Sequence, residues 1–443
     1  MNNFCGLPTE LLHYIAFVLS LLDTTDILSL ALTSKHLYNE FLHPEDTITR
    51  RYINSLLSIP ALLENIEDPE FQHGLRIKIE REGVTDAMEI LWKVAKCRCT
   101  GEFIEFVLKL PGINVNAVTE PRAYTPLDVA SESGNLDIVT ALLAHPEIDM
   151  KANEYGQTSL HLASICGHAE VVTALLSIPG IDVNTYKSGR SPLHSASEYG
   201  HVEVVAALLA HSEIDVNVDD WNGCTSLHSA CYEGHAKVVT ALLAHPGIDV
   251  DADGWNEGIT LHSAIRYGHA EVVAALLAHP EIDVNAVDWS EGITLHSAIR
   301  YGHVEVVAAL LAHPEIDVNA TEQNGCTPLH SAIRYGHVEI VTALLAHTDI
   351  DVNADDCDGC TSLHLASMFG HIEVVTELLA HPEIDMNATE QYGCTPLHTA
   401  IKYGYVEVVT ALLAHPEIDM NATEQNGYTP CLLYTSPSPR DRG

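Results

Sequence analysis

The chain has few basic residues. Its 443 residues include 21 Lys and Arg against 61 Asp and Glu, which gives a formal net charge of -40 at pH 7. Nucleic acids and anionic membranes attract basic surfaces, so neither is an expected partner. The sequence also lacks an apolar run of the roughly 20 residues that a transmembrane helix needs. The short apolar segment 14–22 follows Glu10 with no Lys or Arg before it, unlike a secretory signal, and we expect a cytoplasmic or nuclear protein.

The motifs of common enzymes are absent too. No nucleophile-elbow serine, glycine-rich phosphate loop or His-Glu-x-x-His string occurs. The 11 cysteines do not follow the pattern of a disulfide framework, and Cys357 and Cys360 form a lone Cys-x-x-Cys without the second ligand pair of a zinc site. We therefore expect no catalytic residue, no cofactor and no metal.

What the sequence does contain is a repeat. The tetrad Thr-Pro-Leu-His, or a near copy, recurs at steps of 33 or 34 residues. A period of this length indicates a solenoid of stacked supersecondary units. The first slot holds Asp128, and the later slots hold His161, His194, His228, His262, His296, His330, His364 and His398.

The copy that begins at Thr327 shows how one repeat is expected to fold. The Thr327 hydroxyl can cap a helix and Pro328 suits its first position. Gly336 permits a turn into a second helix, and the Asn-, Asp- and Gly-containing stretch 315–325 predicts a hairpin-like connector. The expected apolar faces are Leu329, Ala332 and Ile333 on the first helix, and Val338, Ile340, Val341, Leu344 and Leu345 on the second.

These features resemble the ankyrin-repeat family. The resemblance rests on Thr-Pro-Leu-His-Ser-Ala at 327–332, Gly-His at 336–337, Leu-Leu at 344–345 and Asp-Val-Asn-Ala at 351–354. It implies an all-α solenoid of helix-turn-helix repeats that binds other proteins, with tetrad histidines that bond neighbouring loops. Nine repeats are expected over 125–430 with the start of a tenth, and a degenerate first repeat with its connector over 86–124.

Two copies depart from the tetrad. They read Ile-Thr-Leu-His from Ile259 and from Ile293, so the capping Thr and the Pro are both missing in register. Losing such a cap costs about 1 kcal/mol. These repeats are predicted to be the least stable.

The amino-terminal residues do not follow the period. Residues 5–50 are expected to form a small helical head, and 51–85 a helical linker. The strings Leu-Pro-x-Glu-Leu-Leu at 7–12, Ile15, Asp-Ile at 26–27 and Thr-Ser-Lys-x-Leu-Tyr at 33–38 resemble the F-box found ahead of ankyrin arrays in fungal proteins, although 15–26 is about two residues longer than usual. The resemblance implies docking onto the adaptor subunit of a cullin–RING ubiquitin ligase through Leu7, Pro8, Leu11, Leu12 and Ile15. The alternative is a head that only caps the array.

The carboxyl-terminal segment breaks the repeat phase. After Pro430 the tetrad should continue Leu-His, but residues 431–443 instead resemble one translated frame of a common sequencing adapter. We therefore expect 431–443 to be a non-native tail.

Two columns are candidate partner-binding residues. Trp221, Trp255 and Trp289 each lie seven residues before a tetrad His, and large aromatic residues are enriched in interfaces. Recent duplication of 255–286 and 289–320 could equally explain them. The second column is Arg266-Tyr267, Arg300-Tyr301 and Arg334-Tyr335, echoed by Lys402-Tyr403; its alternative is pairing of the cations with Glu271, Glu305 and Glu339.

The favoured hypothesis is a protein–protein interaction module that serves as substrate receptor of a cullin–RING ubiquitin ligase. The rival is an ankyrin scaffold with no ligase role. Residues 125–430 carry 8 Lys and Arg against 43 Asp and Glu, which favours a basic protein target. We expect a monomer.

Overall fold

The computed structural model describes residues 66–67, 69–82, 87–119, 123–150, 157–185, 189–250, 253–254, 258–288 and 292–435. The head residues Leu7, Pro8, Leu11, Leu12 and Ile15 lie outside the described residues, as do Trp255, Trp289 and the tail from 436 onward. The chain divides into two compact units. Unit one holds residues 1–196 and 206–214, and unit two holds residues 197–205 and 215–443.

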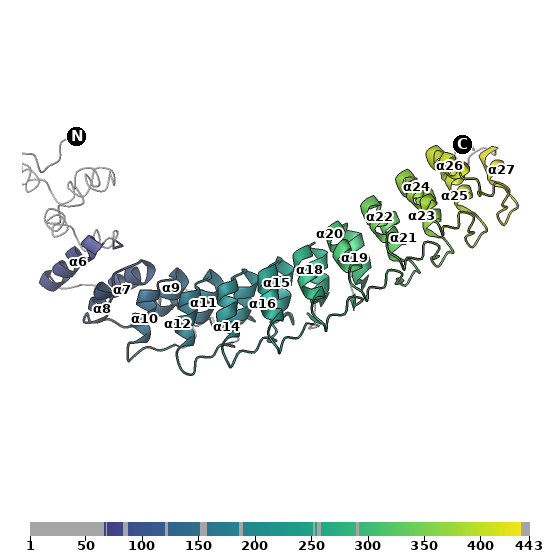
Figure 1. The fold of residues 1–443 in the computed structure, drawn as a ribbon. Helices are drawn as coiled ribbons and strands as arrows, with labels where there is room; N and C mark the ends of the chain where they lie inside the picture. The colour runs from purple at the N-terminus through teal and green to yellow at the C-terminus, as the bar shows by residue number, and fades with distance from the viewer. Residues whose placement is uncertain are drawn as a thin grey trace, which may run out of the picture. The chain divides into compact units, whose positions relative to one another are not determined.

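After α6 (Pro69–Glu82), the helices of unit one follow in pairs (Figure 1). They are α7 (Ala87–Lys96), α8 (Gly101–Leu108), α9 (Pro126–Ser133), α10 (Leu136–Leu143), α11 (Ser159–Cys166) and α12 (Ala169–Leu176). The next pair, α13 (Pro192–Glu198) and α14 (Val202–Leu209), contributes residues to both units.

Unit two continues the alternation of first and second helices. Its elements are α15 (Ser226–Glu233), α16 (Ala236–Leu243), β1 (Asp253–Gly254), β2 (Gly258–Ile259), α17 (Thr260–Arg266), α18 (Ala270–Leu277), β3 (Val287–Asp288), β4 (Gly292–Ile293), α19 (Thr294–Tyr301), α20 (Val304–Leu311), α21 (Pro328–Tyr335), α22 (Val338–Leu345), α23 (Ser362–Phe369), α24 (Ile372–Ala380), α25 (Pro396–Tyr403), α26 (Val406–Leu413) and α27 (Pro430–Thr435).

The tetrad works as a helix N-cap, as α21 shows. The Thr327 hydroxyl accepts a hydrogen bond from the His330 backbone N–H, and Pro328 occupies the first turn. The His330 ring completes a capping box, because its Nδ1 accepts the Thr327 backbone N–H at 3.2 Å. Gly336 ends the helix with φ +75°, in the left-handed region. The predicted cap and turn are confirmed.

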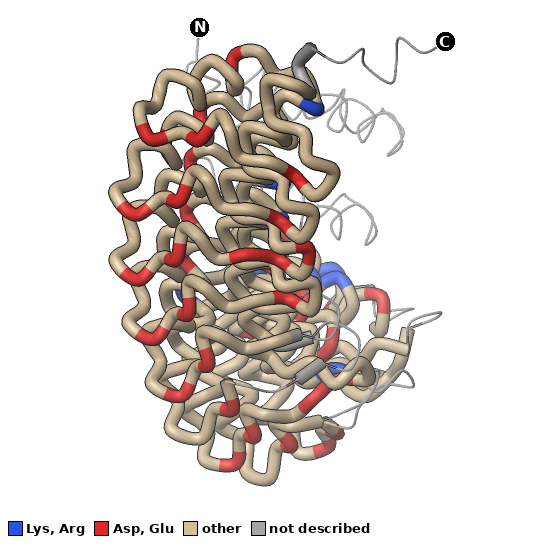
Figure 2. The backbone as a smooth tube through the Cα atoms, turned by 90° about the vertical axis from the view of Figure 1, so that its right-hand side faces the viewer, with Lys and Arg blue, Asp and Glu red and all other residues tan. Residues whose placement is uncertain are grey.

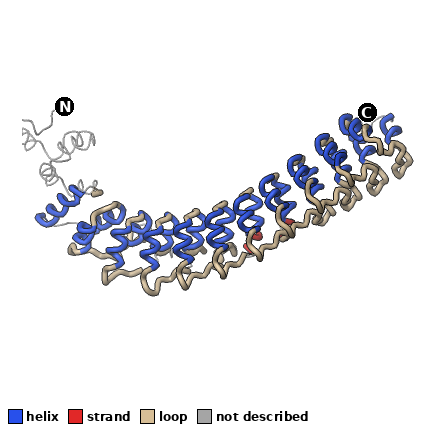
Figure 3. The backbone as a smooth tube through the Cα atoms, viewed as in Figure 1, coloured by secondary structure: helices blue, strands red, loops and turns tan. Residues whose placement is uncertain are grey.

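Neighbouring repeats cover each other's apolar faces. In unit one α9 packs against α11 and α10 against α12; in unit two α21 packs against α23 and α22 against α24. The predicted faces are confirmed in α21 and α22, where the fully buried residues are Leu329, Ala332, Ile333, Ile340, Val341 and Leu344; Val338 and Leu345 are half-buried. The fold is the predicted all-α solenoid, and helices dominate both units in Figure 3.

The connectors of the described residues form short antiparallel pairings. β1 pairs with β2 and β3 with β4, two residues to a strand, and single bridges join Asp219 to Thr225 and Asp355 to Thr361. The hairpin-like connectors expected from the sequence are thus present. The two longer pairings belong to the two copies that lack the capping Thr.

In one of these copies the loss of the cap is confirmed at Ile293, which makes no side-chain cap bond. The connector compensates in part, since the Thr294 hydroxyl donates to the Val284 carbonyl and its backbone N–H to the Ala286 carbonyl. Nδ1 of the buried His296 ring has no hydrogen-bond partner among the described residues. The cap has been replaced, but one buried acceptor is left unsatisfied.

Searched over its described residues, the structure has no helix that is both long and apolar enough to cross a membrane.

Candidate protein-binding surface

The tetrad histidines join successive repeats. His330 Nε2 donates to the Cys360 carbonyl of the next connector at 3.0 Å, while Nδ1 accepts from Thr327. Both ring nitrogens are therefore used by the neutral Nε2–H tautomer. Equivalent bonds to the following connector are made by His161, His262, His296, His364 and His398, which confirms the predicted loop-bonding role.

Burial makes the charged form of these rings unfavourable. It lowers the pKa of His330, and the bond to the Cys360 carbonyl only partly offsets that effect. Burial is also the main cause that lowers the pKa values of His161, His296 and His364. Neutral, hydrogen-bonded rings of this kind are structural groups.

A second set of histidines begins the second helices. His235 Nε2 lies 2.9 Å from the Glu198 carbonyl of the preceding repeat, and its ring packs on Gly200. A Cβ at Gly200 would lie 2.7 Å from that ring, so glycine is required both for its φ of +74° and for space. Gly134 and His168, Gly234 and His269, and Gly268 and His303 repeat the arrangement.

The third set of histidines ends the second helices. Nδ1 of His313 accepts the Glu315 backbone N–H at 3.3 Å, which closes the turn after α20. All three sets of histidines therefore have a structural role. In the part of the chain that the structure describes, no group of three His, Cys, Asp or Glu side chains could hold a metal.

An asparagine ladder also joins repeats, and it was not predicted. Asn319 Nδ2 donates to the Asp349 carbonyl at 2.7 Å, and its Oδ1 accepts the Asp351 N–H at 2.9 Å. Asn116 makes the same two bonds in unit one, to Glu147 and Asp149. The only sequence signal was the recurrence of Asn one step after a buried aliphatic residue, as in Val352-Asn353.

In the part of the chain that the structure describes, the cysteines form no disulfide. Burial is the main cause that raises the pKa of Cys360 to about 12, and burial likewise raises the pKa of Cys394 to about 11. Such thiols stay protonated at neutral pH and are weak nucleophiles.

Aromatic side chains recur in exposed positions at the ends of the first helices. We define the aromatic row as Tyr199, Tyr267, Tyr301, Tyr335, Phe369 and Tyr403, which occupy one position in successive repeats of unit two, apart from the α15 repeat, which has Glu233 there. Their exposed fractions run from 38% at Tyr301 to 54% at Tyr199. Exposed aromatic side chains in a row form an apolar surface of the kind that binds partners.

Five of the six rings of the row stack on neighbouring histidines. Tyr301 stacks on His303 at 6.0 Å between centroids, and His303 Nε2 lies 3.1 Å from the Arg266 carbonyl of the preceding repeat. Four further members stack on the histidine two residues on: Tyr199, Tyr267, Tyr335 and Phe369. The row is a preorganised surface.

Cations accompany the row. Residues 215–430 contain five Lys and Arg, and four of them, Arg266, Arg300, Arg334 and Lys402, directly precede a ring of the row. Figure 2 shows Asp and Glu recurring on successive connectors, with few Lys and Arg between them.

The three arginines make different contacts. Arg266 lies over the Tyr267 ring at 5.9 Å, and Arg300 forms an ion pair with Glu322 at 3.1 Å. Glu322 lies on the following connector and is not among the predicted acidic partners. Arg334 donates to Cys326 Sγ at 3.3 Å.

The tryptophan column is described at one position only. Trp221 is 72% exposed at the tip of its connector. The predicted alignment of Trp221 with Trp255 and Trp289 stays a prediction, since the other two lie outside the described residues.

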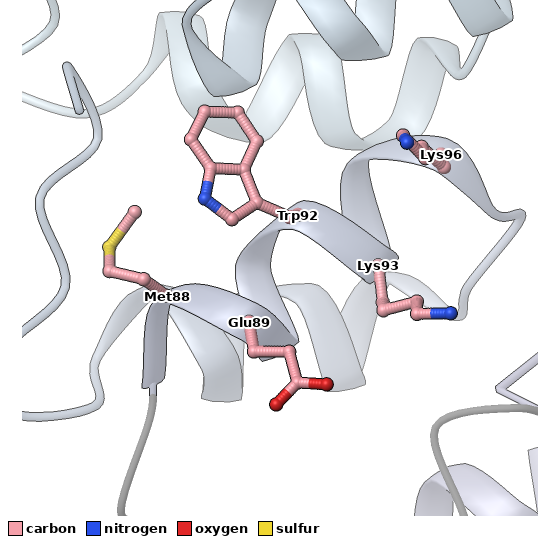
Figure 4. A pocket seen from close by; sticks show the side chains of 5 residues that line it. All are labelled: Met88, Glu89, Trp92, Lys93 and Lys96. Atoms are coloured by element: carbon pink, nitrogen blue, oxygen red, sulfur yellow. The ribbon is translucent and has the colours of Figure 1, made fainter. Parts of the chain in front are cut away.

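A cavity of about 300 Å³ lies beside α7 in unit one (Figure 4). Its lining residues all belong to that helix: Met88, Glu89, Trp92, Lys93 and Lys96. Among the described residues no second element contributes a lining side chain, so the described part of the lining lacks the converging polar groups of a small-molecule site.

A family model matches most of the chain. This model, which comprises three ankyrin repeats, matches the chain over overlapping stretches. These are residues 91–187, 177–254, 222–288, 251–322, 295–390 and 351–424. No curated protein matches the chain. Among solved structures, the ankyrin repeat domain of Bcl-3, described as a unique member of the IkappaB protein family, is 28% identical with a TM-score of 0.46, and the match covers 51% of this chain and 100% of that one. The family matches span most of the sequence, and the chain belongs to the ankyrin-repeat family, whose arrays are protein–protein interaction modules.

Proposed function

We propose that this protein is a target receptor, in which unit two binds a protein through the aromatic row and the head recruits a cullin–RING ubiquitin ligase. The observation that carries the target-binding half is the row itself, whose six rings are 38% to 54% exposed and four of which directly follow an Arg or Lys. Tyr and Arg are the residue types that dominate binding hot spots. The ligase half rests on the F-box resemblance of Leu7, Pro8, Leu11, Leu12 and Ile15.

A plain binding scaffold is the second candidate. It keeps the row as the target surface and leaves the head as a cap on the first apolar face of the array. In either case the protein acts in the cytoplasm or nucleus and is not an enzyme. The net charge of the array as a whole favours a basic target. Most of the Lys and Arg residues of unit two, however, lie beside the aromatic row.

Affinity capture with the full chain, read by mass spectrometry, separates the two candidates. Leu11→Asp with Ile15→Asp should remove cullin-ligase subunits from the eluate and keep the target. Tyr335→Ala with Phe369→Ala should remove the target and keep the ligase subunits. Val406→Ala, which truncates an apolar residue 65% exposed outside the row, is the matched control and should lose neither.

Three results would count against the proposal. Absence of ligase subunits from the unmodified chain leaves the scaffold as the function. Loss of helical content across the array in the Leu11→Asp, Ile15→Asp variant identifies the head as a structural cap. Undiminished capture of the target by the Tyr335→Ala, Phe369→Ala variant rejects the row as its binding surface.

A further inference from the structure

We infer that the aromatic row receives an extended acidic segment of the partner, with an apolar side chain at every third position. This inference rests on the proposed function, because it specifies what the target presents to unit two. It follows from the spacing expected between the first helices, the stacking of the rings on histidines and the charges beside them.

The spacing expected between the first helices, whose ends carry the rings, matches an extended peptide. The first helices α19, α21, α23 and α25 pack in order, and packed helices lie about 8–10 Å apart. A polyproline II chain advances about 3.1 Å per residue, so three residues cover roughly 9 Å. A peptide that runs across these helix ends therefore places every third side chain near the next ring. A helical segment advances only about 1.5 Å per residue and would not keep this register over so few residues.

The orientation of the rings lowers the cost of binding such a peptide. Tyr335 and Phe369 stack on His337 and His371, at 6.2 and 5.9 Å between centroids. These stacking contacts favour one arrangement of each ring before a partner arrives, so less side-chain freedom is lost on contact. Tyr335 is 48% exposed and Phe369 is 39% exposed, which leaves each with apolar area to bury.

The cations beside the row favour an acidic segment of the partner. Among the described residues, neither Arg334 nor Lys402 forms an ion pair with a carboxylate, and both side chains are exposed. The nearby connector acids are engaged in their own turns: Asp356 accepts the backbone N–H of Cys360, and Glu390 accepts that of Cys394. Two cations beside the rings are thus available to carboxylates of a partner.

The acidity of the rest of the array does not cancel this local preference. The Debye length at physiological ionic strength is about 8 Å, so exposed charges further away than that are largely screened. Close to the row, the cations decide which side chains are accommodated. More distant acidic residues would slow the approach of an acidic segment and would make binding tighter at moderate than at very low salt.

The test is a selection of displayed random 12-residue peptides on the full chain. Peptides retained by the unmodified chain are then passed over the double variant Arg334→Glu, Lys402→Glu, and those that bind the variant are discarded. The expected survivors carry apolar residues at positions i, i+3 and i+6 with Asp or Glu between them. In titrations, a survivor should bind the double variant at least tenfold more weakly.

Lys237→Glu is the matched control. It reverses the fifth cation of residues 215–430, which lies exposed on the second helix α16, away from the row position. It should leave peptide affinity unchanged, and thermal melts of all variants should stay close to that of the unmodified chain. If Lys237→Glu weakens peptide binding by the same factor, the effect comes from the net charge of the chain alone, and the inference is rejected.

Enrichment of basic peptides, of peptides without the three-residue period, or of none at all also overturns the inference. Each of these results differs from failure of the proposed function, in which the Tyr335→Ala, Phe369→Ala variant still captures the target. A target that is lost with the row but contributes a basic segment would keep the function and reject the acidic class.

Discussion

The two units share one scaffold and differ at the ends of their first helices. Both contain left-handed glycines backed by histidine rings, as at Gly134 in unit one and Gly234 in unit two. Both contain asparagines that join successive connectors. At the position of the aromatic row, however, unit one has Ser133 and Cys166, where unit two has tyrosine or phenylalanine in every repeat except that of α15, which has Glu233.

The contrast separates structural positions from recognition positions. A residue that recurs in both units is needed for stacking, because every repeat must join its neighbours in the same way. A residue type that recurs only in unit two is not required by the fold. The exposed rings and their cations belong to this second kind, and binding is therefore expected in unit two.

The largest expected effect comes from truncating a buried side chain at a position that both units share. Leu142 in unit one and Leu344 in unit two are both fully buried in second helices. Leu142→Ala and Leu344→Ala should each cost about 2–5 kcal/mol, from lost burial and the cavity left behind. Urea unfolding, followed by hydrogen exchange to locate the damage, measures both. A loss confined to one of the two variants would show that the units are not built on one scaffold.

A smaller effect should distinguish two glycines at the same helix end within unit two. Gly234 and Gly404 end α15 and α25 with φ of +80° and +79°, so alanine at either suffers the left-handed penalty of about 1–2 kcal/mol. A Cβ at Gly234 would also lie 2.6 Å from the His269 ring, whereas nothing lies within 4 Å at Gly404. Displacing that ring disturbs the His269 bond to the Tyr232 carbonyl.

Gly234→Ala should therefore destabilise more than Gly404→Ala, by about the 1–3 kcal/mol typical of strain or a lost buried partner. Thermal melts of the two single variants make the comparison. Equal losses would mean that the histidine ring moves aside freely, and that the Gly-His contact is not a stabilising feature of the scaffold.

Much of this scaffold could be predicted from the sequence. The period, Thr327 with Pro328, and Gly336 follow local rules that apply within one repeat. The asparagine ladder and the stacking of Tyr301 on a histidine that reaches the preceding repeat could not, since both depend on which atoms of adjacent repeats meet. The capping role of His330 was also missed, because the familiar capping box has Glu or Gln at that position.

The candidate site was predicted only in part. The Arg-Tyr column was named from the sequence, but its extension to Tyr199, Phe369 and Tyr403 as one exposed row required the structure. The contact of Arg300 with Glu322 could not be anticipated, because 22 residues separate the two and a connector intervenes. Predictions for the Trp column and for the head lie outside the described residues, apart from Trp221.

The tetrad slot offers a pH test of the comparison. In unit two His330 occupies this slot, with a pKa lowered by burial; in unit one Asp128, whose pKa burial raises, precedes His161, whose pKa burial lowers. As the pH falls below about 6.5, the unfolded chain takes up the histidine proton before the folded chain does, so stability is lost. Asp128 acts in the opposite sense, because its folded form holds a proton more readily than the unfolded chain.

Acidification from pH 7.5 to 5.5 should accordingly lower the urea midpoint of unit two. His330→Gln, which keeps a donor and an acceptor but does not titrate, should make that decline shallower. Hydrogen exchange corrected for intrinsic rates assigns the change to a unit. An unaltered pH dependence in His330→Gln would show that this histidine does not control the acid response.

The smallest expected effect on stability is at the connector tip. Trp221 is 72% exposed, so its ring gains little from folding, and Trp221→Ala should change stability by no more than about 0.5 kcal/mol. Its value to the protein would come on binding, where burying a large aromatic ring contributes strongly, and target affinity should fall by more than about 1 kcal/mol. Thermal melts and titrations with the captured target measure the two quantities separately. An early melt with normal binding would make Trp221 a packing residue, and no change in either would mark it as a relic of repeat duplication, leaving the aromatic row as the sole recognition element of unit two.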